Sequence, residues 1–120
     1  VLAVSPDEPS TKYGVVAGLG DLDGDGYGDL AVAAPDHRDG DAFVGRVNFF
    51  HGGPGILKSE PSWVTESNQD HAYYGNAVAS AGDVNGDGLD DLLVGAPYYD
   101  NGQINEGAVF LFPGAPTGVS

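Results

Sequence analysis

Cysteine is absent from the 120 residues, so the chain can have neither a disulfide framework nor a zinc–thiolate site. Basic residues are scarce: four Lys and Arg stand against 18 Asp and Glu, which gives a formal net charge of −14. This charge disfavours binding to nucleic acid and to anionic membranes. No stretch of about 18 consecutive apolar residues occurs, so no insertion into a membrane is expected.

Sequence signatures of catalysis are also missing. The chain has no Gly-x-Ser-x-Gly elbow and no His-Glu-x-x-His motif, two patterns that mark hydrolase and metalloprotease sites. Its three histidines, His37, His51 and His71, stand far apart without a shared spacing, and we interpret them as surface residues. The sequence therefore predicts a protein that is not itself an enzyme.

The most informative feature is one acidic loop that occurs in two copies. Loop one runs from Asp21 to Asp29 and loop two from Asp83 to Asp91, both with Gly at loop position 6. Positions 1, 3, 5 and 9 carry side-chain oxygens, from Asp21, Asp23, Asp25 and Asp29 in loop one and from Asp83, Asn85, Asp87 and Asp91 in loop two. Carboxylates crowded into one turn repel each other unless a hard cation neutralises them, and Ca²⁺ takes roughly six to eight oxygen ligands at about 2.4 Å. We predict two calcium sites, one per loop.

An EF-hand loop begins with the same Asp-rich pattern, yet it needs an acidic ligand at position 12 and a helix on each side. Position 12 here is Val32 in loop one and Val94 in loop two, each inside an apolar run of strand character. The EF-hand interpretation is therefore disfavoured. Metal-free solvated turns are disfavoured as well, because a chance Asx-rich turn rarely recurs with its flanks intact.

The two loops belong to a longer internal repeat with an offset of 62 residues, the distance from Asp21 to Asp83. Matching positions beyond the loops include Ala34-Pro35 with Ala96-Pro97, Gly45 with Gly107, Val47 with Val109, and Phe50 with Phe112. Tyr13-Gly14 matches Tyr74-Gly75 at an offset of 61. Such self-similarity predicts a repeat architecture. We divide the chain into two repeats, about 1–58 and 59–120, within a single domain.

The segments around the loops have strand character. Short apolar runs at 15–17 and 77–79 precede the loops, and denser runs at 30–33 and 92–95 follow them and end at Ala-Pro. Runs this short and β-branched, closed by proline, favour strands over helices. Third strands are predicted at 46–50 and 108–112, and a fourth at 62–65 with its counterpart at 1–4. Four short strands per unit are typical of a propeller blade. The unbroken run Leu92-Leu93-Val94 further indicates a strand covered on both faces.

The second unit resembles the FG-GAP repeat of integrin α-subunit β-propellers and their bacterial relatives. The resemblance is carried by Tyr74-Gly75, loop two, the following Gly95-Ala96-Pro97 and the strand after Gly107. The resemblance implies an all-β fold made of two four-stranded propeller blades. It also implies that the backbone carbonyls of Tyr27 and Leu89, at position 7, join the calcium ligands and that the calcium is structural. Asp90, at position 8, has no ligand role in this pattern and is expected to face solvent.

The resemblance further implies a calcium-binding scaffold for protein or glycan interaction, outside a cell or on its surface. The alternatives are an accessory propeller domain of a secreted hydrolase and a lectin-like, glycan-binding propeller. Five aromatic residues could form a sugar-binding rim, although packing in the core or between blades is expected of them. They are Trp63, Tyr73, Tyr74, Tyr98 and Tyr99.

Two blades alone would leave apolar outer faces in water, and repeat proteins of this type generally need at least about three stacked units. We therefore expect the fold to be completed in one of two ways. The chain forms a homo-oligomer, for example a trimer with 3 × 2 = 6 blades, or it is part of a longer propeller whose other blades cover those faces.

Overall fold

The computed structural model describes residues 12–54, 61–116 and 118–119, and every regular element within them is a β-strand. Two large antiparallel sheets form most of the described structure, with the strand orders β1-β2-β5-β6 and β7-β8-β9. The strands of the first sheet are β1 (Val15–Gly20), β2 (Asp29–Ala34), β5 (Arg46–Phe50) and β6 (Trp63–Glu66). Those of the second are β7 (Ala77–Gly82), β8 (Asp91–Ala96) and β9 (Ala108–Phe112). The all-β prediction is confirmed, and the described part of the chain holds no helix that could cross a membrane.

Two small ribbons complete the described structure. In the first, β3 (Arg38–Asp39) pairs with β4 (Ala42–Phe43), and in the second β10 (Gly114–Ala115) pairs with β11 (Gly118–Val119). The strands predicted at 46–50 and 108–112 are confirmed to the residue as β5 and β9. The strand predicted at 1–4 lies outside the described residues.

The two sheets repeat each other in backbone geometry. Val16 lies opposite Val32 in the first sheet, and Val78 lies opposite Val94 in the second. Both pairings shift register just before the loop, between Gly18 and Gly20 in the first sheet and between Ser80 and Gly82 in the second. An irregularity of this kind bends a strand and ends regular pairing, which suits the start of a tight loop.

The outer strand of the first sheet comes from the start of the second sequence repeat. β6 pairs with β5, with Val64 opposite Asn48. The blade and the sequence repeat are therefore offset by one strand, because the segment that opens one repeat closes the sheet of the repeat before it.

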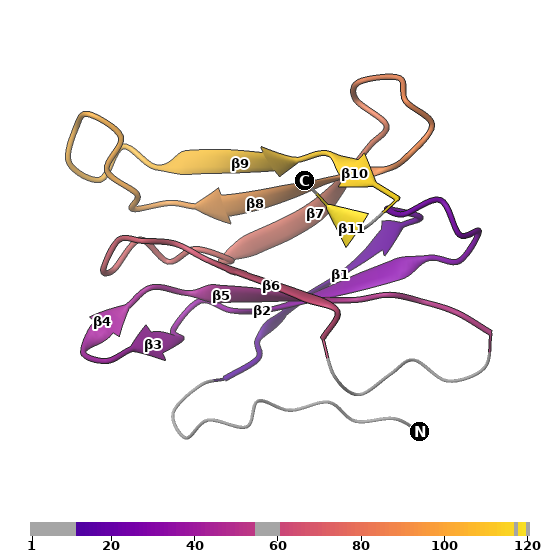
Figure 1. The fold of residues 1–120 in the computed structure, drawn as a ribbon. Coiled ribbons are helices and arrows are strands. Elements are labelled where there is room, and N and C mark those ends of the chain that lie inside the picture. The colour runs from indigo at the N-terminus through magenta and orange to yellow at the C-terminus, as the bar shows by residue number, and fades with distance from the viewer. Residues whose placement is uncertain (1–11, 55–60, 117, 120) are drawn as a thin grey trace.

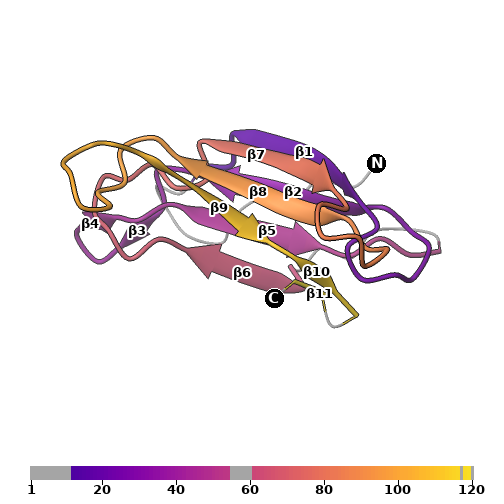
Figure 2. The ribbon, with the colours of Figure 1, turned by 90° about the horizontal axis from the view of Figure 1, so that it is seen from above.

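The sheets pack face to face as two layers, with β7, β8 and β9 lying over β1, β2 and β5 (Figures 1 and 2). Alternate residues of each strand point into the interface, as the period of two in a strand requires. The buried contributors are Leu19, Ala31, Ala33, Val47 and Phe49 from the first sheet and Leu92, Val94 and Ala96 from the second. These side chains form the described core between the blades.

Tyr74 and Gly75 lie where the second blade contacts the first. The Tyr74 side chain is buried, its hydroxyl lies 3.2 Å from Thr65 Oγ1, and its ring makes an edge contact with Phe110. A Cβ on Gly75 would lie 3.1 Å from both Ala33 Cβ and Val47 Cγ2, so the second blade approaches the first here with almost no spare room. Trp63 of β6 also makes an edge contact with Phe112 of β9, with ring centres 5.6 Å apart. The expectation of aromatic packing in the core or between blades is therefore confirmed for Tyr74 and Trp63.

The opposite face of the second blade is open. Val109 and Leu111 of β9 are 70% and 47% exposed, and Leu93 of β8 is only half-buried. β2 is buried at five of its six positions, whereas β8 alternates along part of its length. The prediction that Leu92, Leu93 and Val94 are covered on both faces is therefore met only on the face that meets the first blade.

Candidate metal centre

Both acidic loops join the first two strands of a sheet, and both lie at the same end of the molecule, on the right in Figure 1. Their glycines at position 6 share one unusual conformation, with φ of +89° at Gly26 and +88° at Gly88. Only glycine adopts such angles without strain. Both positions therefore require glycine, and the chain turns at the same point in both copies.

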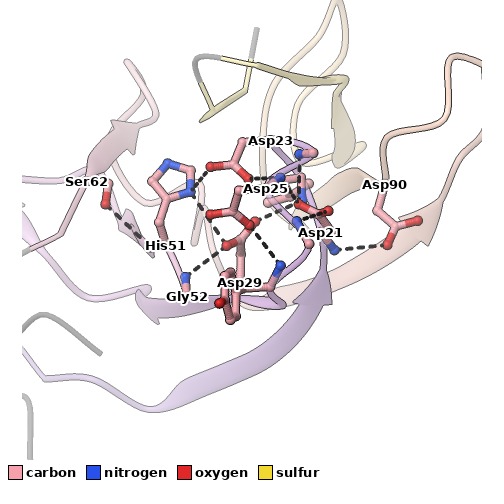
Figure 3. Close-up of polar contacts among 12 residues, drawn as sticks. Asp21, Asp23, Asp25, Asp29, His51, Gly52, Ser62 and Asp90 are labelled. Atoms are coloured by element: carbon pink, nitrogen blue, oxygen red, sulfur yellow. Dashed lines mark hydrogen bonds and ion pairs between the residues drawn. The ribbon is translucent and has the colours of Figure 1, made fainter. Parts of the chain in front are cut away.

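Backbone amides organise loop one around Asp21 at position 1 (Figure 3). Asp21 Oδ1 accepts hydrogen bonds from the amides of Gly24 at 2.7 Å and Asp25 at 3.1 Å, and Oδ2 accepts one from Gly26 at 2.8 Å. Asp23 Oδ1 accepts from the Asp25 amide at 3.1 Å, and Asp25 Oδ1 accepts from the Tyr27 amide at 2.9 Å. Each carboxylate thereby fixes the turn that follows it.

Loop two repeats this network. Asp83 Oδ1 accepts from the amides of Gly86 at 2.8 Å and Asp87 at 3.1 Å, and Oδ2 accepts from Gly88 at 2.8 Å. Asn85 Oδ1 accepts from the Asp87 amide at 3.2 Å, and Asp87 Oδ1 from the Leu89 amide at 2.9 Å. Asn85 thus takes the same place as Asp23, with an amide oxygen instead of a charged one.

The aspartate at position 9 anchors each loop to the sheet. Asp29 is buried, its Oδ2 accepts from the Leu22 amide at 2.8 Å, and its Oδ1 accepts from the Gly52 amide at 2.9 Å. Asp91 makes the equivalent bonds with Val84 and Gly114, both at 2.8 Å. Position 9 therefore ties the loop to the chain that follows the third strand.

The donor set and its geometry fit a hard divalent cation. Oxygen atoms of Asp21, Asp23 and Asp25 lie within 4.8 Å of one another, and two ligands of one Ca²⁺ can be at most about 4.8 Å apart when each bond is about 2.4 Å. A carboxylate oxygen that accepts one amide hydrogen bond keeps a lone pair for a metal. The ligand roles of the side chains at positions 1, 3, 5 and 9, and of the Tyr27 and Leu89 carbonyls, stay predictions.

Electrostatics in loop one reflect the crowding of its carboxylates. The amide of Gly26 is the main cause that holds the pKa of Asp21 below its ordinary value. Burial, together with the charges of Asp29 and Asp25, raises the pKa of Asp23. A cation between these groups would remove the repulsion that disfavours the ionised form of Asp23.

Asp90, at position 8 of loop two, was predicted to face solvent, but it contacts loop one instead. Its Oδ2 accepts a hydrogen bond from the Asp21 amide at 3.2 Å, and its own amide donates to the Asp21 carbonyl at 3.1 Å. A Cβ at Gly20 would overlap the Asp90 carboxylate, so glycine makes room for this contact. The prediction was wrong because packing of the two blades brings loop two against the first residue of loop one, 69 positions earlier (Figure 3).

Comparison with known proteins agrees with this geometry. The family model of the FG-GAP repeat matches residues 13–47 and 74–112, which contain both loops. The chain belongs to the FG-GAP repeat family. Each match begins at a Tyr-Gly pair and runs through the loop into the third strand of a blade. The resemblance seen in the sequence is confirmed, and the fold consists of two integrin-like propeller blades.

The relatives of this FG-GAP chain include proteins of two kinds. Integrin alpha-PS2 of Drosophila melanogaster is 40% identical over 116 residues, covering 88% of this chain and 8% of that protein. Integrin alpha-5 of Xenopus laevis is 32% identical over 120 residues, covering 96% of this chain and 11% of that protein. Phosphatidylinositol-glycan-specific phospholipase D of Rattus norvegicus is 38% identical over 119 residues, covering 92% and 14%. The FG-GAP chain thus spans about a tenth of the length of the curated relatives it matches.

Sequence reasoning missed one residue that lies beside loop one of this FG-GAP chain. His51 directly follows β5, and its Nδ1 lies 3.1 Å from Asp23 Oδ2 and 3.6 Å from Asp29 Oδ1 (Figure 3). The antiparallel pairing of Leu30 with Phe50 brings it there, since Asp29 and His51 are the next residues along the two strands. His37 is buried, at 1% exposure. The interpretation as surface residues was therefore wrong for His37, whereas His51 is partly exposed and His71 is exposed as expected.

Proposed function

We propose that this chain is a calcium-stabilised propeller module that serves as an interaction scaffold outside a cell or on its surface, and that it has no catalytic role of its own. The observation that carries the calcium role is the duplicated loop, in which one hydrogen-bond network recurs twice at the same end of adjacent blades and brings carboxylate oxygens together in loop one. The similarity to integrin alpha subunits supports the placement outside the cell.

Calcium in this role is structural, with one ion in each loop. Each ion would be held by the side chains at positions 1, 3, 5 and 9 and by the carbonyl at position 7. It would bind the folded loop and not the unfolded chain, so it stabilises the fold by RT ln(1 + [L]/Kd), about 2.7 kcal/mol at one hundred times Kd. Its main chemical contribution is to neutralise the crowded carboxylates that lie between the first two strands of a blade.

Thermal unfolding of the full chain, with Ca²⁺ and with excess chelator, tests this role. We expect chelation to lower the melting temperature and Asp87→Ala to remove the part of that response due to loop two. Asp39→Ala is the matched control, because Asp39 is an exposed carboxylate in β3, outside both loops. Identical melting curves with and without chelator would contradict the structural role of calcium.

The open face of the second blade supports the proposal that another blade covers it. In the first blade, Tyr74-Gly75 packs against Gly45, Ala33 and Val47. Their repeat partners are Gly107, Gly95 and Val109, which line an open groove of about 470 Å³ together with Asn76, Ala77, Ala96, Pro97, Glu106 and Ala108. By this correspondence the groove suits a Tyr-Gly pair from a further repeat, either in a longer parent chain or in a second copy such as that of a trimer.

Light scattering on the 120 residues distinguishes the two sources. A closed oligomer supports assembly from copies, whereas a chain that folds stably only when further repeats are attached supports a longer propeller. A stable, well-folded monomer with no further repeat would contradict the proposal that this face must be covered.

The segments that join β6 to β7 and β8 to β9 lie at the end opposite the loops, on the left in Figure 1, and they carry a candidate interaction surface. Tyr73 and Tyr98 stack edge to face with ring centres 5.4 Å apart, and they are 37% and 50% exposed. Beside them, Pro35, Asp36, Phe43 and His71 line a small pocket of about 80 Å³ together with Tyr73. His71 and Tyr73 have φ of +61° and +57°, and backbone strain at non-glycine residues often marks functional sites.

We propose that this aromatic surface contacts a protein or glycan ligand, since exposed tyrosine rings suit either partner. A glycan array and a binding screen against extracellular proteins test it, with Tyr98→Ala as the variant and Val84→Ala as a matched control, because the Val84 side chain is 55% exposed and lies in loop two. Ligand binding that survives Tyr98→Ala unchanged would contradict the role of this surface.

A second candidate function is that of an accessory domain in a larger enzyme. It is favoured by the 38% identity to phosphatidylinositol-glycan-specific phospholipase D. A hydrolase assay on the parent chain, with and without these two blades, tests it. Activity that depends on the blades would favour the accessory role over the adhesion scaffold.

A further inference from the structure

His51 gives loop one a nitrogen donor that loop two lacks. The equivalent position in the second repeat, 62 residues after His51, is Pro113, whose ring offers no nitrogen that could bind a metal. Loop two also has the neutral Asn85 where loop one has Asp23. The two loops are therefore alike in backbone and in hydrogen bonding but different in the chemistry of their side chains.

The Nδ1 atom of His51 is shielded from solvent and forms no hydrogen bond, the one such buried side-chain atom among the described residues. It lies 3.1 Å from Asp23 Oδ2 and 3.6 Å from Asp29 Oδ1, which is close enough for attraction but poorly aligned for donation. A shielded nitrogen that lacks a well-aligned hydrogen bond is costly. Figure 3 shows the ring directed at the two carboxylates.

These separations suit a shared metal ion. Donor atoms of the three residues all lie within 4.8 Å of one another. Neighbouring ligands of a first-row transition ion with bonds of about 2.1 Å are separated by about 3.0 Å at right angles and about 3.4 Å in a tetrahedron. The two measured distances from Nδ1 lie close to this range, so one ion could contact all three groups with small side-chain adjustments.

We propose that loop one, unlike loop two, binds a divalent transition ion through His51 Nδ1 and the carboxylates of Asp23 and Asp29. Imidazole suits borderline ions such as Co²⁺ or Zn²⁺, whereas Ca²⁺ takes oxygen ligands. This inference rests on the proposed function in that it concerns the same loop. Because Asp23 and Asp29 are also the predicted calcium ligands, Ca²⁺ and the transition ion compete for loop one.

The experiment uses Co²⁺ as the probe with the full chain in calcium-free buffer, followed by calorimetry and by the visible absorption of the bound ion. Loss of the imidazole in His51→Gln is expected to weaken Co²⁺ binding about tenfold or more, while Ca²⁺ affinity changes less than about threefold because imidazole is not its preferred ligand. His71→Gln is the matched control, since His71 is exposed and outside the loop. It is expected to change neither affinity.

Two results would overturn the proposal. Co²⁺ affinity within about threefold of the wild-type value in His51→Gln would show that the imidazole is not a ligand, since loss of a supporting contact alone costs roughly tenfold. An equal loss of Co²⁺ and Ca²⁺ affinity would make His51 a support for the loop instead of a metal ligand. The calcium titration of loop two is independent of both, so failure of Ca²⁺ to bind there contradicts the proposed function and not this inference.

If His51→Gln does not fold, the wild-type chain still decides. With ¹⁵N-labelled histidine, one equivalent of Co²⁺ is expected to shift or broaden the ring signals of His51 far more than those of His71. Unaltered His51 signals at saturating Co²⁺ would overturn the proposal. As a converse variant, Pro113→His combined with Asn85→Asp is expected to give loop two a second Co²⁺ site.

Discussion

Gly45→Ala is a sharp test of how the second blade is seated on the first. Gly45 lies between β4 and β5 with φ of +73°. A Cβ there would overlap the carbonyl oxygen of Tyr74, far inside the 3.0 Å limit that real Cβ atoms essentially never cross. The clash is with backbone, so no side-chain rotation can relieve it. The substitution must therefore displace the chain around Tyr74, which carries the contact between the blades.

Two terms contribute to the expected loss of stability. A left-handed conformation costs alanine roughly 1–2 kcal/mol, and forcing an extra carbon into a packed site costs about 1–3 kcal/mol. Gly40→Ala is the matched control, because Gly40 has φ of +63° and a Cβ there would have nothing within 4 Å. The control bears only the first term, and both variants share the stabilising effect of alanine on the unfolded chain. We expect Gly45→Ala to unfold more easily than Gly40→Ala by about 1–3 kcal/mol.

Urea unfolding in Ca²⁺-containing buffer measures this difference from the two midpoints, provided the slopes agree. A difference below about 0.5 kcal/mol, the usual limit for independent surface changes, would refute the reasoning. It would mean that Tyr74 is not held against Gly45 in solution, and the packing of the two blades would then need another explanation.

Three further outcomes follow from the loops and the core. Tyr74→Phe keeps the ring contact with Phe110 but loses the hydrogen bond between the hydroxyl and Thr65. Urea unfolding should therefore show a free energy of unfolding lower by about 0.5–1.5 kcal/mol. An unchanged free energy would mean that this bond contributes nothing. Gly88→Val removes no ligand side chain, yet strain of about 1–3 kcal/mol at φ of +88° should weaken Ca²⁺ binding about tenfold in calorimetry; unchanged affinity would contradict the loop geometry. The pKa of Asp83 is lowered below 3.8, mainly because its carboxylate accepts a hydrogen bond from the Gly88 amide. In calcium-free buffer the ionised carboxylate therefore stabilises the fold above pH 3.8. This contribution is lost as the pH falls through the pKa of Asp83 in the folded state. Urea midpoints between about pH 5 and pH 3 should therefore fall less steeply in Asp83→Asn than in wild type, and equal slopes would count against this role of Asp83.

Local pattern was enough to predict much of the fold. The loops and most strands could be placed because composition and turn residues act over a few positions, as at β5 and β9. Gly26 and Gly88 recur at position 6 of both loops, and the structure shows that the tight turn there needs a left-handed conformation. The repeat supported the placement of loops and strands in both copies at once, because each feature recurs with its flanks.

The features that sequence reasoning missed all depend on contacts between distant segments. Asp90 meets Asp21 only because two blades pack, and nothing near Asp90 in the sequence signals that contact. His51 reaches loop one through the pairing of β2 with β5. A usable signal did exist there, because pairing Leu30 with Phe50 would have placed His51 beside Asp29.

The hydrogen bonds between Asp90 and Asp21 give the array of repeats a direction. The first unit has Gly28 at loop position 8 where the second has Asp90, so the two copies differ at the residue that meets the preceding blade. If the units exchanged places, the amide of Asp83 would face Gly28, which has no side chain to accept its hydrogen bond. Duplicated blades are therefore not interchangeable parts. Recombination that shuffles them has to move position 8 together with the loop it faces in the neighbouring blade.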